Sequence, residues 1–122
     1  MNISDETLAY PSAQCKGHLS AVEDALYVIG GKWKLKIMTA VLSGHIRFNE
    51  LQRTIVGISA RVLSNELKQL ELNGLVERVV QADKTPVIIE YRPTTYAASL
   101  GEVLVALSNW GTNHKQKIKA KG

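Results

Sequence analysis

A glycine at position 57 separates two stretches whose apolar residues recur with helical spacing, and this break constrains the fold most. Ser59 follows it, and a serine hydroxyl there can accept a hydrogen bond from a free N–H of a helical first turn. Asn73 and Gly74 supply a stop, because glycine readily adopts the left-handed conformation. Three leucines occur between these signals at i, i+4 and i+7, namely Leu63, Leu67 and Leu70. The segment 59–73 is therefore predicted to be a helix with one buried face.

Shorter helical patterns precede this segment. Apolar residues at helical spacing predict one helix over residues 22–29 and a second over residues 33–42, each followed by small residues that favour a helix end. A third, short helix fits RFNELQRTI, residues 47–55. The first dozen or so residues are polar and lack a clear period. They are expected to form a mobile arm.

The chemistry becomes β-like after Gly74. LVERVVQA (75–82) and PVIIEY (86–91) are rich in Val and Ile and flank the short polar stretch DKT (83–85), a pattern that predicts a hairpin. Pro93 is expected to end the second strand. Residues 94–111 then return to a helical period.

The order of helices, turn, helix, hairpin and helix is that of a winged helix-turn-helix, a mainly α fold with a small β-hairpin (α+β). We divide the chain into a flexible arm (1–20), the winged core (21–93), a C-terminal dimerisation helix (94–114) and a basic tail (115–122). In such folds the helix after the turn enters the DNA major groove, and the hairpin can approach the flanking backbone or minor groove.

Chain length and charge limit the number of domains and the kinds of partner that can be inferred. A chain of 122 residues suits one ordinary domain. No long apolar run suggests a membrane span and no signal for export is visible, so the cytoplasm is the expected compartment. Much of the net charge of +4 comes from lysines in the last thirty residues, where a disordered solubilising tail is the commoner explanation. Net charge alone therefore does not establish nucleic-acid binding.

Several segments resemble the HxlR-type regulators, a branch of the winged-helix transcription factors related to the MarR type. The resemblance rests on VEDALYVIGGKWKLKIM (22–38), on SGHIRFNELQRTIVGISARVLSNELKQLELNGLVER (43–78), on the strand end (86–94) and on LGEVLVALSNWG (100–111). It implies a homodimeric bacterial DNA-binding protein that controls nearby genes, often in response to oxidants, electrophiles or small metabolites. It implies no catalytic role.

Polar side chains share one side of the predicted 59–73 helix, away from its leucines. They are Arg61, Ser64, Asn65 and Lys68, with Ser59 at the start of the helix. Arginine can bind guanine O6 and N7, asparagine can pair with an adenine edge, and serine or lysine can hold phosphates. An ordinary solvated face is the alternative. The position after the turn favours DNA contact.

Further DNA contacts are expected outside this helix. Arg47 and Asn49 stand at the start of the third helix, where they can meet a phosphate, although Arg47 can equally pair with Glu50 or another acid. Lys84 lies at the predicted hairpin tip, and Arg78 and Arg92 lie on or beside its strands. A tip lysine is often only a turn residue, but the architecture favours contact with DNA.

An apolar stripe marks the C-terminal helix, at Leu100, Val103, Leu104, Leu107 and Trp110. It is too apolar for a helix that covers a small core, so we expect it to pair with a second copy of the chain under two-fold symmetry. Packing wholly on its own domain is the alternative. A dimer would set two recognition helices about one helical turn of DNA apart.

The only cysteine, Cys15, lies near Lys16, and a positive neighbour can favour the reactive thiolate. Relatives in the HxlR family commonly carry a Cys-Pro pair just before the position of Val22, where this chain has Ser20 and Ala21. An incidental exposed thiol and a redox sensor are therefore both open.

No catalytic group, cofactor or metal site is expected. The sequence shows no acid–base pair or nucleophile with a partner, and the three histidines lack the spacing of metal ligands. Four aromatic residues could line an effector pocket but are more often core or dimer-contact residues, namely Trp33, Tyr91, Tyr96 and Trp110. The predicted function is sequence-specific transcriptional regulation, and the competing prediction is a winged helix that binds other proteins.

Overall fold

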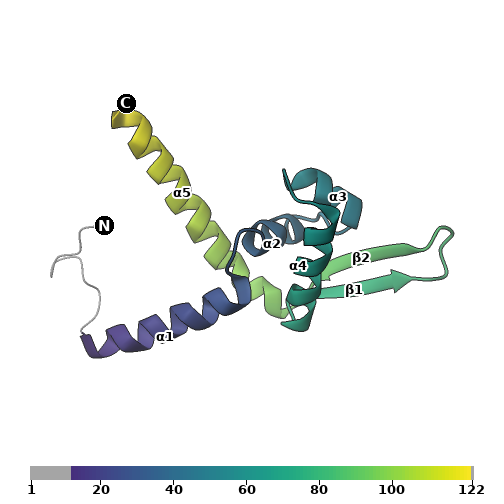
Figure 1. Ribbon diagram of the computed structural model, residues 1–122, viewed down its shortest axis with the longest axis horizontal. Coiled ribbons are helices and arrows are strands. Elements are labelled where there is room, and N and C mark those ends of the chain that lie inside the picture. Colours follow the sequence, from purple (N-terminus) through teal and green to yellow (C-terminus); the bar gives the residue numbers. More distant parts are fainter. Residues whose placement is uncertain (1–11, 122) are drawn as a thin grey trace. The chain divides into compact units, whose positions relative to one another are not determined.

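The computed structural model describes residues 12–121 (Figure 1). The chain divides into two compact units after Gly31, and each is described here by itself. The first contains helix α1 (Ser12–Ile29), and the second contains all the other elements. Over residues 12–121, no helix combines the length and the apolar character that crossing a bilayer requires.

Helix α1 begins earlier than the sequence pattern predicted. Residues 12–20, assigned above to a flexible arm, are helical, while residues 1–11 lie outside the described part. Residues 14–27 are all exposed, and Ile29 at the end of the helix is the one buried residue among positions 14–29. Residues 12–18 carry no large apolar side chain, so no apolar period marked this part of the helix.

The second unit confirms the predicted fold class: four helices, a short 3-10 helix and a two-stranded antiparallel sheet. Its elements are α2 (Lys34–Leu42), α3 (Phe48–Thr54), α4 (Ala60–Leu72), β1 (Val76–Gln81), β2 (Ile88–Pro93), the 3-10 helix η1 (Tyr96–Leu100) and α5 (Gly101–Lys121). Figure 1 shows the hairpin extending from the side of the unit that carries α3 and α4.

The core of this unit lies between α2, α3 and α4 and the root of the hairpin. Its largest fully buried side chains are Ile37, Met38, Val41, Leu51, Leu63, Leu67, Leu70 and Val76. The three leucines of α4 are among them, as the spacing predicted. Burying each such side chain contributes roughly 1.5–3 kcal/mol relative to leaving it exposed. This packing fixes which side of α4 faces outward.

The predicted boundaries of α4 are confirmed. Gly57 has a φ of +87°, a conformation that glycine adopts without strain, and it makes the turn between α3 and α4. The Ser59 hydroxyl accepts a hydrogen bond from the Val62 N–H at 3.1 Å and caps the helix. Gly74, with a φ of +76°, follows the C-cap Asn73.

The hairpin has a longer connection than predicted. β2 begins at Ile88 rather than at Pro86, so residues 82–87 join the strands. A proline has no N–H to donate to a ladder, which makes Pro86 a poor strand residue. On β2, the Tyr91 N–H donates to the Ile46 carbonyl at 2.7 Å, which ties the hairpin to the segment before α3.

Helix α5 continues to Lys121, so residues 115–121, predicted above to be a disordered tail, are helical. Their lysines, glutamine and alanine are good helix formers, and no glycine or proline lies between Gly111 and Lys121. The helix follows η1, whose entry is fixed by Thr94: its Oγ1 donates to the Gly74 carbonyl at 2.6 Å and accepts from the Ala97 N–H at 3.1 Å. No residue of α5 described by the structure is buried.

Candidate DNA-binding surface

The polar face of α4 is open to solvent. The side chains predicted to contact DNA from this helix are all exposed, namely Arg61, Ser64, Asn65 and Lys68. They lie on the side of the helix away from the three buried leucines. Ser59 is exposed as well, but its hydroxyl oxygen is occupied by the cap. The structure therefore presents a polar strip of mixed donors and acceptors over residues 61–68 of the helix.

An ion pair that the sequence reasoning missed fixes α4 against α2. The Lys34 Nζ lies 2.6 Å from the Glu66 Oε2, and these side chains are only 12% and 20% exposed. Glu66 is one position after Asn65 on the helix, so it turns inward while Asn65 turns outward. The pair sets the rotation of the polar face relative to the core.

A hollow of about 200 Å³ lies between α4 and the hairpin. Its lining comes from Ser64, Lys68 and Glu71 on α4 and from Arg78 and Tyr91 on the strands. Arg78 and Tyr91 face each other in the strand register. The structure thus brings together three predicted contact residues, from a helix and a strand, on one concave surface. Tyr91, which was not predicted as a contact residue, joins them.

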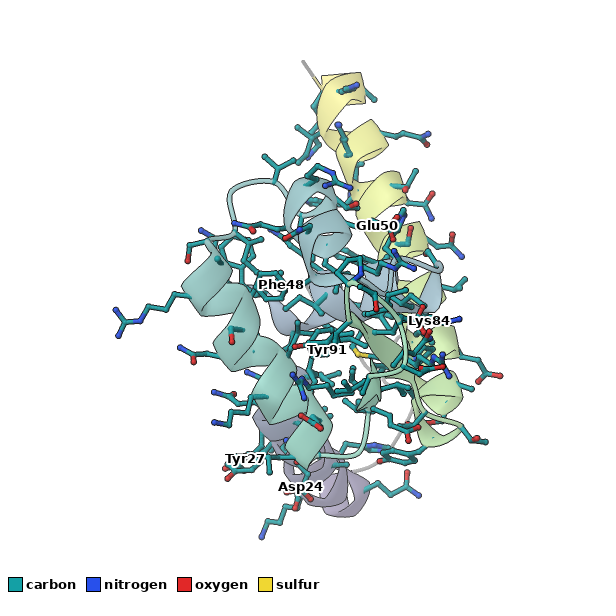
Figure 2. The ribbon with its side chains drawn as sticks, turned by 90° about the vertical axis from the view of Figure 1, so that its right-hand side faces the viewer. Asp24, Tyr27, Phe48, Glu50, Lys84 and Tyr91 are labelled. Atoms are coloured by element: carbon teal, nitrogen blue, oxygen red, sulfur yellow. The ribbon has the colours of Figure 1, made fainter. Side chains whose placement is uncertain are left out.

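The hairpin carries basic side chains with and without an acidic partner. Lys84 lies near its end, as Figure 2 shows, and is exposed. Arg92 is held within its own strand, where its guanidinium donates to the Glu90 carboxylate, with the Nε at 2.9 Å. Gln81 also donates to Glu90, at 3.1 Å. Arg78, unlike Arg92, forms no ion pair within residues 12–121.

The start of α3 forms a second concave region with the hairpin. A hollow of about 510 Å³ is lined by Arg47, Asn49 and Arg53 and by the wing segment 86–89. Arg47 and Asn49 are both exposed. The alternative that Arg47 pairs with Glu50 is wrong, because Glu50 lies 3.2 Å from the Nδ1 of His45 instead. Within the described chain, the guanidinium of Arg47 has no carboxylate partner.

The C-terminal stripe is largely uncovered in the protomer. Val103 is 43% exposed, Leu107 49% and Trp110 65%, while Leu104 is half-buried. Leu100 differs from its prediction, because it belongs to η1 and is buried in the core of its own unit. The stripe that remains available therefore starts at Val103.

Helix α1 presents the only cysteine of the chain. Cys15 is exposed, as are the larger apolar side chains further along, Leu19, Val22, Leu26 and Tyr27. An exposed thiol is accessible to oxidants. Among residues 12–121, no three histidine, cysteine or acidic side chains cluster as a metal site would require.

Comparisons with known proteins give one consistent result. The family described as HxlR-like helix-turn-helix matches residues 28–119. The HTH-type transcriptional regulator YtcD of Bacillus subtilis is 37% identical over 98 residues, which cover 80% of this chain and 77% of YtcD. Among solved structures, the redox regulator HypR in its reduced form is 33% identical with a TM-score of 0.75, covering 82% of this chain and 98% of HypR. The reduced transcriptional regulator YodB of Bacillus subtilis is 34% identical with a TM-score of 0.66, covering 74% and 87%.

Proposed function

The chain belongs to the HxlR-like helix-turn-helix family of transcriptional regulators, and on that premise we propose that it binds an inverted-repeat DNA operator as a homodimer. The observation that supports this most is the outward polar face of α4. The ends of this helix and its buried leucines are fixed, so the same polar side chains always face outward. In this arrangement α4 enters the major groove and the hairpin follows the flanking backbone.

The side chains divide between base and backbone contacts by their chemistry. Arg61 and Asn65 are the base-reading candidates, because a guanidinium matches guanine O6 and N7 and a carboxamide matches adenine N6 and N7. Backbone phosphates are assigned to the remaining exposed polar residues, namely Arg47, Asn49, Ser59, Ser64, Lys68, Arg78 and Lys84. The cations among these have no acidic partner in the described chain, so their charge is available to a phosphate.

Dimerisation is assigned to the stripe of α5. Val103, Leu107 and Trp110 form an exposed apolar row, and burying such a row against its symmetry mate removes it from water. Leu104, half-buried, lies at the edge of the same row. Two copies joined in this way would present two α4 helices to successive half-sites.

The decisive experiment selects bound fragments from a random duplex library with the reduced protein near physiological salt. We expect enrichment of an inverted repeat. Arg61→Ala and Asn65→Ala should each relax the preference at one symmetric pair of positions, by about 1–3 kcal/mol per base pair. Gln69→Ala, an exposed change on the same helix, serves as the control. Binding without any enriched motif would favour a protein-interaction module instead.

A second candidate function is a response to oxidants through Cys15. The exposure of this thiol favours it, and the similar protein HypR is described as a redox regulator. In this proposal two Cys15 thiols of a dimer lose two protons and two electrons to an oxidant such as diamide and form one interchain disulfide. Non-reducing electrophoresis after diamide treatment should show a covalent dimer that Cys15→Ser abolishes. Absence of this dimer in the native chain would identify Cys15 as an incidental thiol.

A further inference from the structure

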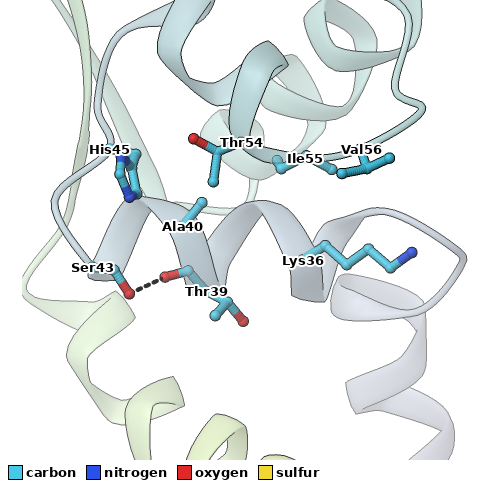
Figure 3. Close-up of a pocket in the computed structure, with 8 residues that line it drawn as sticks. All are labelled: Lys36, Thr39, Ala40, Ser43, His45, Thr54, Ile55 and Val56. Carbon is cyan, nitrogen blue, oxygen red and sulfur yellow. Dashed lines mark hydrogen bonds between the residues drawn. The ribbon is translucent and has the colours of Figure 1, made fainter.

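A pocket of about 470 Å³ lies between α2 and the end of α3 (Figure 3). Lys36 and Ala40 line it from α2, and Thr54, Ile55 and Val56 line it from the end of α3 and the turn that follows. Its volume falls in the range of about 300–1,000 Å³ that is usual for small-molecule sites. None of these residues belongs to the proposed DNA-binding face or to the α5 stripe.

The middle of the pocket is apolar and its ends are polar. Ala40 and Ile55 are 6% and 5% exposed, so they form a floor that cannot move away from a ligand. Figure 3 shows Lys36 at one end and His45 at the other, with Ala40 and Thr54 between them. The pocket therefore suits an elongated molecule with an apolar body.

Two polar side chains of the pocket, Lys36 and Thr54, are free to donate a hydrogen bond to a ligand. Within the described residues the Lys36 ammonium has no carboxylate partner and only lies 5.1 Å from the centre of the Trp33 ring. The Thr54 side chain, which is exposed, likewise forms no hydrogen bond there. An ammonium beside an apolar floor attracts an anion, because a charge-assisted hydrogen bond is stronger than a neutral one.

The remaining hydroxyls cannot compete for that anion. The Thr39 Oγ1 donates to the Leu35 carbonyl at 2.7 Å, and the Ser43 Oγ donates to the Thr39 carbonyl at 2.7 Å. Both protons are therefore used by the helix, and these oxygens offer only lone pairs to a ligand. The Nδ1 of His45 is already engaged with Glu50. Lys36 is thus the group that decides the charge of the ligand.

We propose that this pocket binds a small carboxylate with an apolar body, and that the bound molecule changes the affinity of the protein for DNA. The second part rests on the proposed function. Ile55 and Val56 touch the ligand and directly precede Gly57, the turn through which the chain enters α4. A ligand that binds one conformation of this turn more tightly than another increases the population of that conformation. Because the turn leads into α4, the position of α4 changes with it.

Calorimetry on the full chain without DNA tests the binding step, with 4-ethylbenzoate as the probe and 4-ethylbenzyl alcohol as its uncharged match. We expect the carboxylate to bind at least tenfold more tightly than the alcohol. Lys36→Met should remove this difference. Lys32→Met is the matched control, because Lys32 also lies over the Trp33 ring, at 4.8 Å, but does not line the pocket.

Equal or absent binding of the two probes, or equal effects of the two variants, would overturn the binding step. The variants have equal effects if Lys32→Met and Lys36→Met lose carboxylate binding to the same extent. If a second copy of the chain covers the pocket, neither probe binds, and that outcome overturns the proposal too.

Titration of a selected operator with and without 4-ethylbenzoate tests the coupling. The dissociation constant for DNA should change at least fivefold, a typical allosteric effect, and Lys36→Met should abolish the change while it leaves affinity in the absence of ligand unaltered. Specific DNA binding that the ligand does not alter would overturn the coupling. Loss of all specific DNA binding would instead contradict the proposed function, while calorimetry would still decide the pocket.

Discussion

The ammonium of Lys34 lies 2.6 Å from the carboxylate of Glu66, and this ion pair joins α2 to α4 in a place mostly shielded from water. Lys34→Met is expected to lower the free energy of unfolding by about 2–4 kcal/mol, because it leaves a carboxylate without its partner. The double variant Lys34→Met with Glu66→Met should recover most of this loss, since two apolar side chains of similar length leave no charge behind. Urea denaturation measures all three proteins.

The contact between the His45 Nδ1 and the Glu50 carboxylate, 3.2 Å apart, provides the control for that prediction. Its side chains are 40% and 43% exposed, so solvent screens the interaction. Glu50→Gln should therefore change the free energy of unfolding by less than about 1 kcal/mol. Equal losses for Lys34→Met and Glu50→Gln would show that the burial of the α2–α4 pair has no energetic consequence.

Ser59 and Ser64 lie on the same helix but should respond differently to substitution by alanine. Ser59→Ala removes the cap of α4 and should cost about 1 kcal/mol of stability. Ser64→Ala, on the exposed face, should leave stability within about 0.5 kcal/mol and weaken DNA binding alone, whereas Ser59→Ala should affect both the stability and the proposed phosphate contact. Thermal denaturation and operator titration separate the two effects. A stability loss in Ser64→Ala comparable to that of Ser59→Ala would contradict this division.

Arg78 and Arg92 test whether a free guanidinium on the hairpin binds phosphate. Arg78→Gln should reduce the slope of log affinity against log salt by roughly one, because one phosphate contact is lost. Arg92→Gln should leave the slope unchanged, because its guanidinium is already engaged by Glu90. The measurement is operator affinity at four or five salt concentrations. A smaller slope in both variants would mean that Arg92 exchanges Glu90 for DNA.

Leu107 and Val105 are exposed apolar residues on different sides of α5, at 49% and 60%. Leu107→Glu places a charge within the stripe and should convert the dimer into a monomer at micromolar concentration. Val105→Glu lies off the stripe and should leave the dimer intact. Sedimentation equilibrium measures the mass of each variant. Dissociation by Val105→Glu alone would move the interface to the opposite side of the helix.

The spacing of apolar residues predicted those helices and strands that pack one apolar side against the core. The leucines of α4 and the small residues at both of its ends were sufficient to place that helix within about a residue. Residues 12–20 and 115–121 are helical, and residues 14–20 and 115–121 are exposed, so no helical period of buried apolar residues marked these segments. Their helix propensity was the available signal, and propensity alone is a weak guide.

In the candidate site too, some features could be predicted from the sequence and others could not. Spacing on α4 predicted that Arg61 and Asn65 would be exposed together. The pairing of Lys34 with Glu66 joins residues far apart in the chain, which one sequence cannot reveal. The pairing of Arg92 with Glu90 was visible in principle, because residues two apart on a strand point to the same face.

The hydrogen bond from the Tyr91 N–H to the Ile46 carbonyl fastens the root of the hairpin to the loop before α3. The connection at residues 82–87 lies beyond both strands and outside this anchor. Insertions or deletions there would lengthen or shorten the reach of the hairpin without disturbing α4. In the proposed DNA complex, such changes would alter how much flanking DNA the hairpin spans and leave unchanged the bases that α4 contacts.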